Sequence, residues 1–191
     1  MSREDFMSQF NNLDQLKLRV SYGTTGNQDG ISDFGTRNGY SKTAYNQSPG
    51  YYHSILGNAD LMWETSAQFD LGADLRMFDN RLNASVDFYV KNTKDLLMDK
   101  KISQTSGFSE IKTNAGSIRN TGVELAINGT PVRTKDFEWN IGANITFNKN
   151  QITDLGTWAN ADNKFINGDY LYEVGKSLGT WYMVEWAGVN P

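Results

Sequence analysis

Hydrophobic and polar residues alternate with a period of two along several stretches of the chain. Apolar side chains occupy the odd positions of residues 67–77 and the even positions of residues 82–90, and a short polar segment, residues 78–81, separates the two stretches. Successive side chains of a strand point to opposite faces of a sheet. Each stretch therefore predicts a strand with one apolar and one polar face, and the pair predicts a hairpin.

The same alternation occurs in residues 16–22, 123–128 and 137–148. A further strand is expected over residues 180–187, which are rich in aromatic residues but alternate poorly. No long segment has apolar residues at helical spacing. The sequence thus predicts an all-β fold of about six antiparallel, up-and-down strands.

The connections between these strands fall into two classes. Residues 78–81 and 129–136 form short connections, whereas residues 23–62, 92–117 and 149–180 form long ones. Loops longer than about 12–15 residues are uncommon in compact domains. Long loops at one end of the strands and tight turns at the other are typical of outer-membrane barrels. This order favours part of a large transmembrane β-barrel with short periplasmic turns and long extracellular loops.

Such a barrel wall has one face toward lipid and one toward a wet lumen. We expect the following apolar residues to face lipid: Phe69, Leu71, Leu75, Val86, Phe88, Val123, Leu125, Trp139, Ile141 and Ile145. We expect the alternating polar residues to face the lumen: Gln68, Asp70, Asp74, Asp87, Glu124, Asn140 and Asn144.

Two other classes of protein remain open on the pattern alone. Alternating strands also build soluble β-sandwiches, with one face in the core and the other in water. A sandwich with aromatic loops would be a carbohydrate-binding module. The carboxylates Asp70, Asp74 and Asp87 could alternatively serve acid–base chemistry in a glycan-acting enzyme. Lining of a polar channel is the simpler role for carboxylates interleaved with Arg76 and Lys91.

Composition narrows the chemistry further. The 191 residues are 38% hydrophobic and 13% aromatic, and their net charge of −4 does not favour nucleic acid as a partner. The chain has no cysteine and a single histidine, His53, so thiolate metal sites and His-rich metal sites are excluded. We expect no catalytic residues, no cofactor and no metal site.

Aromatic residues in the long connections are candidates for ligand contact. A ring can stack on a sugar or seal against a partner, and it can equally pack a loop on its neighbour. The candidates for ligand or lid contact are Tyr40, Tyr45, Tyr51, Tyr52, Trp158 and Tyr170. His53, beside Tyr51 and Tyr52, could also stack on a ligand, but a lone exposed histidine in a loop is more often incidental.

Short sequence strings occur in a fixed order over residues 16–191. They are LKLRVSYG (16–23), TGNQ (25–28), WE (63–64), NRL (80–82), DFY (87–89), KDLL (94–97), GF (107–108), NAG (114–116), NTGVE (120–124), Trp139, NKN (148–150) and GVNP (188–191). Together they resemble the SusC/RagA family of TonB-linked outer-membrane transporters.

That resemblance implies a large barrel with an N-terminal plug in a Gram-negative, Bacteroidetes-like outer membrane. It implies import of oligosaccharides or peptides, with a SusD-like surface lipoprotein as the lid and energy from a TonB complex. No signal peptide, plug or closing strand is recognised in residues 1–191. We therefore expect this sequence to be an internal barrel fragment, with the plug and the C-terminal strands absent and the contacts with TonB made by parts outside it.

Overall fold

The computed structural model describes residues 12–160 and 162–189. The chain divides into two units. One comprises residues 1–24, 67–92 and 119–150, and the other comprises residues 25–66, 93–118 and 151–191. The last two residues of the GVNP string and the first eleven residues of the chain lie outside the described part.

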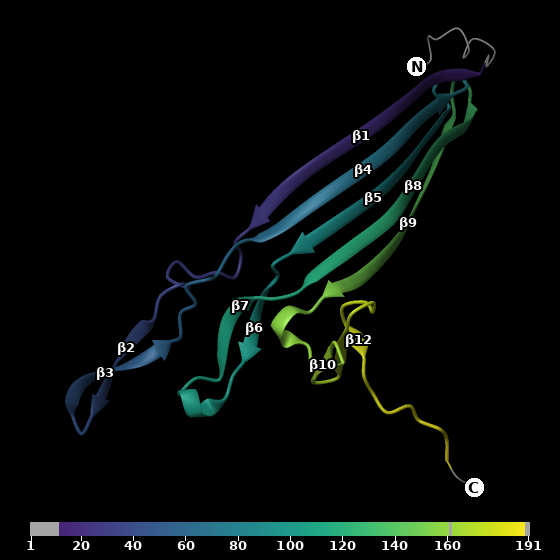
Figure 1. Cartoon of the computed structure of the whole chain (residues 1–191). Helices are drawn as coiled ribbons and strands as arrows, with labels where there is room; N and C mark the ends of the chain where they lie inside the picture. Colours follow the sequence, from purple (N-terminus) through teal and green to yellow (C-terminus); the bar gives the residue numbers. More distant parts are fainter. Residues whose placement is uncertain (1–11, 161, 190–191) are drawn as a thin grey trace. The chain divides into compact units, whose positions relative to one another are not determined.

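Five long strands form an open antiparallel sheet (Figure 1). They are β1 (Leu13–Asn27), β4 (Glu64–Met77), β5 (Leu82–Lys94), β8 (Ser117–Arg133) and β9 (Glu138–Asp154), in the order β1-β4-β5-β8-β9. Their lengths are 13 to 17 residues, whereas strands of soluble sheets usually have about 5–6. The predicted all-β, antiparallel fold is confirmed.

The prediction of a strand over residues 180–187 is wrong for most of that range. Only β12 (Thr180–Trp181) forms there, and it pairs with β11 (Tyr170–Glu173) rather than with the five-stranded sheet. The segment that follows β12 has no strand structure, and Val184 is 98% exposed. Its poor alternation gives it no face to bury, and within the described residues it has no long strand as a partner.

The two short connections are tight turns, as predicted. Between β4 and β5, three consecutive residues (Phe78, Asp79 and Asn80) have positive φ angles of 56° to 61°. Asn and Asp tolerate this left-handed region better than most residues. The N–H of Arg81 closes the turn by donating to the Phe78 carbonyl at 3.2 Å. Between β8 and β9 the turn covers only residues 134–137, so β8 continues five residues beyond its predicted end.

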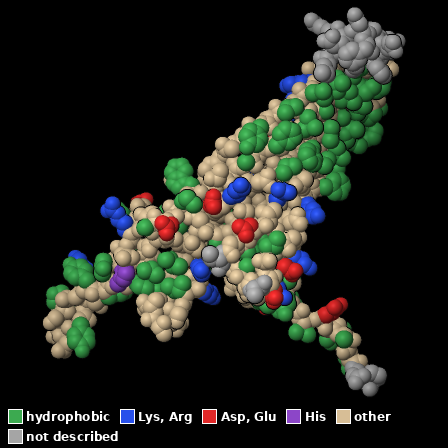
Figure 2. All heavy atoms as spheres, viewed as in Figure 1, with side chains coloured by type: hydrophobic (Ala, Val, Ile, Leu, Met, Phe, Trp, Pro, Cys, Tyr) green, Lys and Arg blue, Asp and Glu red, His purple; other side chains and the backbone are tan. Residues whose placement is uncertain are grey.

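The apolar face of the sheet is not covered by other described residues. Phe69, Leu71, Val86 and Ile141 are 39%, 46%, 41% and 55% exposed. Figure 2 shows hydrophobic side chains gathered over the strands of the five-stranded sheet. Rings and branched side chains beneath a second sheet would be buried, so the part of the chain that the structure describes does not form a β-sandwich.

The long connections contain secondary structure that the alternation did not predict. The first holds a hairpin of β2 (Gly39–Tyr45) and β3 (Ser48–Ile55), and the second holds β6 (Leu97–Lys101), the 3-10 turn η2 (Gln104–Ser106) and β7 (Glu110–Asn114). The third holds η3 (Gly156–Trp158), β10 (Lys164–Asn167), β11 and β12. Asn46 and Gln47, both at positive φ, form the two-residue turn between β2 and β3.

Six of the described residues are buried. Four of them lie at or next to the end of a long strand, where a long connection begins or ends; they are Thr93, Ala115, Ile152 and Leu155, at 2–7% exposure. The other two are glycines within β4 and β8, Gly72 and Gly122. Most of the buried side chains therefore lie where the long connections join the strands.

Among the described residues, no helix has the length and apolar character needed to cross a membrane.

Candidate functional site

An arginine bridges two carboxylates on the polar face of the sheet. Arg19 Nε and Nη2 donate to the two carboxylate oxygens of Asp74, at 2.9 and 3.0 Å. Arg19 Nη2 also lies 2.8 Å from Asp87 Oδ1 and 3.1 Å from Oδ2. The three residues come from β1, β4 and β5, so the bridge joins three neighbouring strands.

Asp70 also accepts hydrogen bonds on this face. Its carboxylate accepts hydrogen bonds from Ser21 Oγ at 3.0 Å and from Gln68 Nε2 at 2.7 Å. All three carboxylates considered for catalysis thus have protein partners. The arrangement is that of a hydrogen-bonded polar wall.

Two glycines make room for large side chains on the polar face. A Cβ atom on Gly72 would lie 2.3 Å from Asp87 Oδ1 and 2.9 Å from Arg19 Cζ. A Cβ atom on Gly122 would lie 2.5 Å from Cζ and Oη of Tyr89, whose hydroxyl donates to Asn148 Oδ1 at 3.2 Å. A side chain at either position would collide with these groups, so glycine is needed for them to occupy this space.

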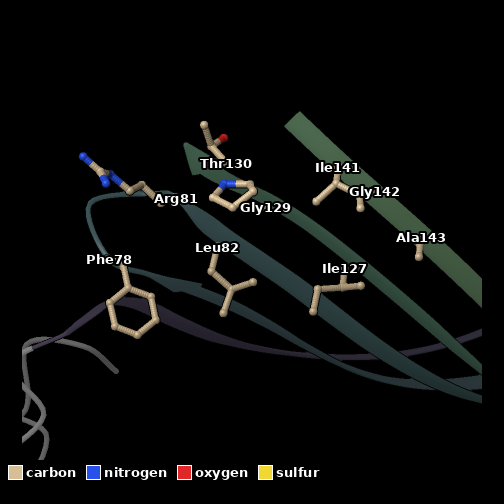
Figure 3. A pocket seen from close by; sticks show the side chains of 10 residues that line it. Phe78, Arg81, Leu82, Ile127, Gly129, Thr130, Ile141, Gly142 and Ala143 are labelled. Atoms are coloured by element: carbon tan, nitrogen blue, oxygen red, sulfur yellow. The ribbon is translucent and has the colours of Figure 1, made fainter. Parts of the chain in front are cut away.

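The opposite face carries shallow apolar hollows. One, of about 540 Å³, is lined by residues that include Leu75, Val86, Leu125 and Ile145. A second, of about 580 Å³, lies beside the short turns; Figure 3 shows Phe78, Leu82 and Ile127 on one side of the strands, with Arg81 extending away from them.

The residues assigned to each face from the sequence separate as alternation requires. Hydrogen bonds gather Gln68, Asp70, Asp74 and Asp87 on the polar side. On the neighbouring strands β8 and β9, Asn140 accepts a hydrogen bond from Thr130 at 2.6 Å. Alternation along continuous strands places the other assigned residues on the polar and apolar faces. Contact with lumen or lipid stays a prediction for every one of them.

The six aromatic candidates do not form one platform. Tyr40 stacks on His53 with ring centroids 5.0 Å apart, and Phe108 meets the same imidazole edge-on at 4.8 Å. Trp158 packs against Phe165 at 5.1 Å, and Tyr170 stacks on Trp181 at 4.9 Å. Tyr40, Trp158, Tyr170 and His53 therefore pack loop segments together.

The other three tyrosines remain exposed on the β2–β3 hairpin. Tyr45, Tyr51 and Tyr52 are 85%, 71% and 53% exposed. The strand register pairs Ser41 with Tyr52 and Lys42 with Tyr51, so Tyr45 and Tyr52 share one face of the hairpin while Tyr51 lies on the other. Tyr40 is also 67% exposed although one side of its ring stacks on His53. These four rings on the hairpin stay candidates for contact with a ligand or a lid.

Two side chains anchor the ends of the first and second long connections. Asn114 Oδ1 accepts from Met62 N–H at 2.7 Å, and its Nδ2 donates to the carbonyls of Met62 and Asp95, both at 2.8 Å. Glu64 accepts from Asn27 Nδ2 at 2.9 Å and from Leu97 N–H at 2.8 Å. The residues joined by these anchors are 19 to 52 positions apart in the sequence, which is why alternation gave no sign of the anchors.

A family model described as TonB dependent receptor-like, beta-barrel, matches residues 7–190. The chain belongs to this family.

Relatives within the TonB-dependent receptors agree with the predicted SusC/RagA resemblance. TonB-dependent receptor P39 of Formosa agariphila is 42% identical over 99% of this chain, and TonB-dependent receptor SusC of Bacteroides thetaiotaomicron is 30% identical over 97% of it. These alignments cover 18% and 20% of the two relatives. The chain thus spans about a fifth of their length.

Solved structures show the same fold for this part of a TonB-dependent receptor. The structure of the RagAB peptide transporter matches 97% of this chain with a TM-score of 0.88 at 36% identity, over 20% of that chain. The RagAB peptide importer in the 'open-open' state matches 90% of this chain with a TM-score of 0.77 at 37% identity, over 19% of that chain. The relatives are receptors and transporters, which supports the expectation that the chain is not an enzyme.

In this TonB-dependent receptor segment, the short strings scattered along the sequence meet in space. Asn27, Glu64, Asp95, Leu97 and Asn114 come from four different strings and share the two anchors. A second meeting point is Tyr89 against Gly122, from two further strings. The strings therefore mark contacts between strands and connections, which no single string could reveal.

We expect Asn114→Ala to make two segments easier to open locally. They are the second long connection and the end of the first connection, just before β4. Three hydrogen bonds to backbone groups disappear, and local opening should become easier by about 1–2 kcal/mol. Limited proteolysis of the full-length receptor carrying this segment should then cut residues 28–63 or 95–116 several times faster. Asn144→Ala, which removes an exposed amide, is the control; equal cleavage of the two variants would show that Asn114 does not anchor these connections.

Proposed function

We propose that this chain is a wall segment of an outer-membrane transporter that imports a nutrient oligomer, an oligosaccharide or a peptide, with TonB-derived energy. The segment supplies five strands of the wall and three extracellular connections. Membership of the TonB-dependent receptors and the likeness to SusC and to the RagAB peptide transporter support this function. The remaining strands and the plug belong to parts of the polypeptide outside this sequence.

The observation that carries the proposal is the exposed apolar face of the sheet. On β5 the apolar positions run from Leu82 to Val90, and the next position on that face is Asn92, whose Oδ1 accepts from Arg119 Nε at 2.7 Å. The eight residue steps from Leu82 to Val90 correspond to about 27 Å of strand, or about 21 Å along the membrane normal at a tilt near 40°. An apolar band about 25 Å tall is what an outer-membrane barrel presents to lipid.

The polar face and the hairpins have separate roles in this proposal. The network of Arg19, Asp74 and Asp87 lines a wet lumen, where charges keep access to water. Tyr45, Tyr51 and Tyr52 lie on the extracellular side, where they contact the substrate or a SusD-like lipoprotein lid. The cell location is the outer membrane of a Bacteroidetes-like bacterium.

The proposal is tested with the full-length receptor that carries this segment, expressed in its outer membrane. We expect it in the detergent-extracted membrane fraction, and we expect cells to accumulate a labelled oligosaccharide or peptide from a panel only when TonB is active. Recovery as a soluble monomer without detergent would contradict the proposal and favour a soluble binding module. Uptake that continues unchanged in cells without TonB would contradict the energy source.

A further inference from the structure

Asparagine is followed by glycine at three places in the chain. The pairs are Asn38–Gly39, Asn128–Gly129 and Asn167–Gly168. The backbone nitrogen of a residue can attack the side-chain amide carbon of a preceding asparagine, and glycine, which has no Cβ and moves most freely, obstructs this attack least. The reaction requires the asparagine side chain and the following backbone to rotate together. The fold therefore decides which of the three pairs can react.

The pair Asn128–Gly129 is held inside a sheet. Both residues lie within β8, which is hydrogen-bonded to β5 on one side and to β9 on the other. A Cβ atom on Gly142 of β9 would lie 2.5 Å from Asn128 Oδ1, so the amide lies directly against the neighbouring strand. Rotation of this pair requires paired backbone to open, and opening within a long central strand is costly.

The pair Asn38–Gly39 is held by its own contacts. Asn38 Oδ1 accepts a hydrogen bond from Gly57 N–H at 3.0 Å. Gly39 is the first residue of β2 and pairs with Ile55, whose Cβ would lie 3.0 Å from a Cβ atom placed on Gly39. The amide must therefore leave Gly57, and the backbone must leave Ile55, before the two groups can meet.

The pair Asn167–Gly168 has no such restraint. Asn167 ends β10 and pairs with Tyr170, so Gly168 and Asp169 form a two-residue turn in which Gly168 has a φ of 60°. Asn167, Gly168 and Asp169 are exposed, and a Cβ atom on Gly168 would meet nothing within 4 Å. Among the described residues, neither the Asn167 amide nor the Gly168 N–H has a hydrogen-bond partner. The strands β10 and β11 have four residues each, so their end opens at low cost.

We propose that Asn167 is a site of spontaneous covalent modification in the third long connection. The backbone nitrogen of Gly168 loses its proton and bonds to Cγ of Asn167, and the side-chain nitrogen gains that proton and leaves as ammonia. Water then opens the resulting succinimide ring at one of its two carbonyls, which gives an aspartate or an isoaspartate at this position. Water is the only other reactant, and no electrons are transferred. This inference does not depend on the proposed function.

The modification changes the β10–β11 hairpin in a defined way. Either product adds a negative charge beside Asp169, and isoaspartate also lengthens the backbone by a methylene group. The longer backbone no longer matches the pairing of Asn167 with Tyr170, which closes the turn. The ring of Tyr170 stacks on Trp181 with centroids 4.9 Å apart, so β12 loses a packing partner when this end of the hairpin opens.

The test is peptide mass spectrometry of the folded, detergent-solubilised full-length receptor after incubation at mildly alkaline pH. Asn167 should be converted about tenfold faster than Asn38 or Asn128, because its pair opens at lower cost. In receptor unfolded in urea, the three pairs should react at similar rates, since the fold no longer restrains them. The variant N167Q should show no conversion at this position, because the longer side chain closes a ring far more slowly.

The same samples provide the outcomes that would overturn the proposal. Conversion of Asn38 or Asn128 as fast as Asn167 in the folded receptor would overturn it, and so would an unmodified Asn167. An equally large preference for Asn167 in urea would show that neighbouring residues, and not the fold, select the site. After incubation, protease should cut residues 155–181 of the unsubstituted receptor faster than those of N167Q, with equal cleavage before incubation. Equal cleavage afterwards would contradict the effect on the hairpin.

Discussion

Leu71→Arg and Ile145→Arg are each expected to lower the free energy of unfolding of the lipid-embedded receptor by about 2–4 kcal/mol. Both residues lie near the middle of their strands on the apolar face, where they are 46% and 49% exposed. If this face meets hydrocarbon, a guanidinium there loses its hydration without gaining a partner. The measurement is urea unfolding in lipid vesicles, followed by tryptophan fluorescence.

The neighbouring residue on the same strand supplies the control. Asn144→Arg adds the same side chain one position earlier on β9, on the polar face, and should change the unfolding free energy by less than about 0.5 kcal/mol. Equal losses for Ile145→Arg and Asn144→Arg would contradict the assignment of the two faces. The comparison keeps strand, depth and side chain constant and changes only the face.

Gly122→Ala should destabilise the receptor by about 1–3 kcal/mol, the usual cost of overpacking. Its new Cβ atom would lie 2.5 Å from the phenol carbon and oxygen of Tyr89. The ring would have to move, and its hydrogen bond to Asn148 would be strained or lost. The same unfolding measurement in lipid gives the size of the effect.

A second glycine and a double variant make this prediction specific. Gly129→Ala, in the same strand, meets no atom closer than 3.7 Å and should cost far less. In a Tyr89→Ala background, Gly122→Ala should lose most of its cost, because the two residues are in direct contact. If Gly122→Ala costs the same with and without the Tyr89 ring, the packing account is wrong.

The two-residue alternation was enough to predict that the main sheet is built from long antiparallel strands. It predicted the tight turn at residues 78–81 as well, because Asp79 and Asn80 accept left-handed backbone angles. It ended β8 too early, since Gly129 and Pro131 read as turn residues although the strand continues to Arg133. Hydrogen bonding with a neighbouring strand outweighed that local preference.

The connections were harder to predict, for two physical reasons. The β2–β3 hairpin depends on a two-residue turn at Asn46 and Gln47, and only the first of these is a usual residue for that turn. The anchors at Glu64 and Asn114 depend on contacts between segments far apart in the sequence. Periodicity describes neighbours along a strand, so it carries no information on such contacts.

The two faces of β4 are the central claim, and residues 67–77 allow it to be measured directly. The chain has no cysteine, so single cysteines can be introduced at each of these positions and carry a nitroxide label in the full-length receptor in lipid vesicles. The account predicts that labels at odd positions, such as Phe69 and Leu71, are relaxed mainly by lipid-soluble oxygen. Labels at even positions, such as Asp70 and Asp74, should be relaxed mainly by a water-soluble nickel complex. Equal accessibility to the nickel complex at odd and even positions would contradict the account.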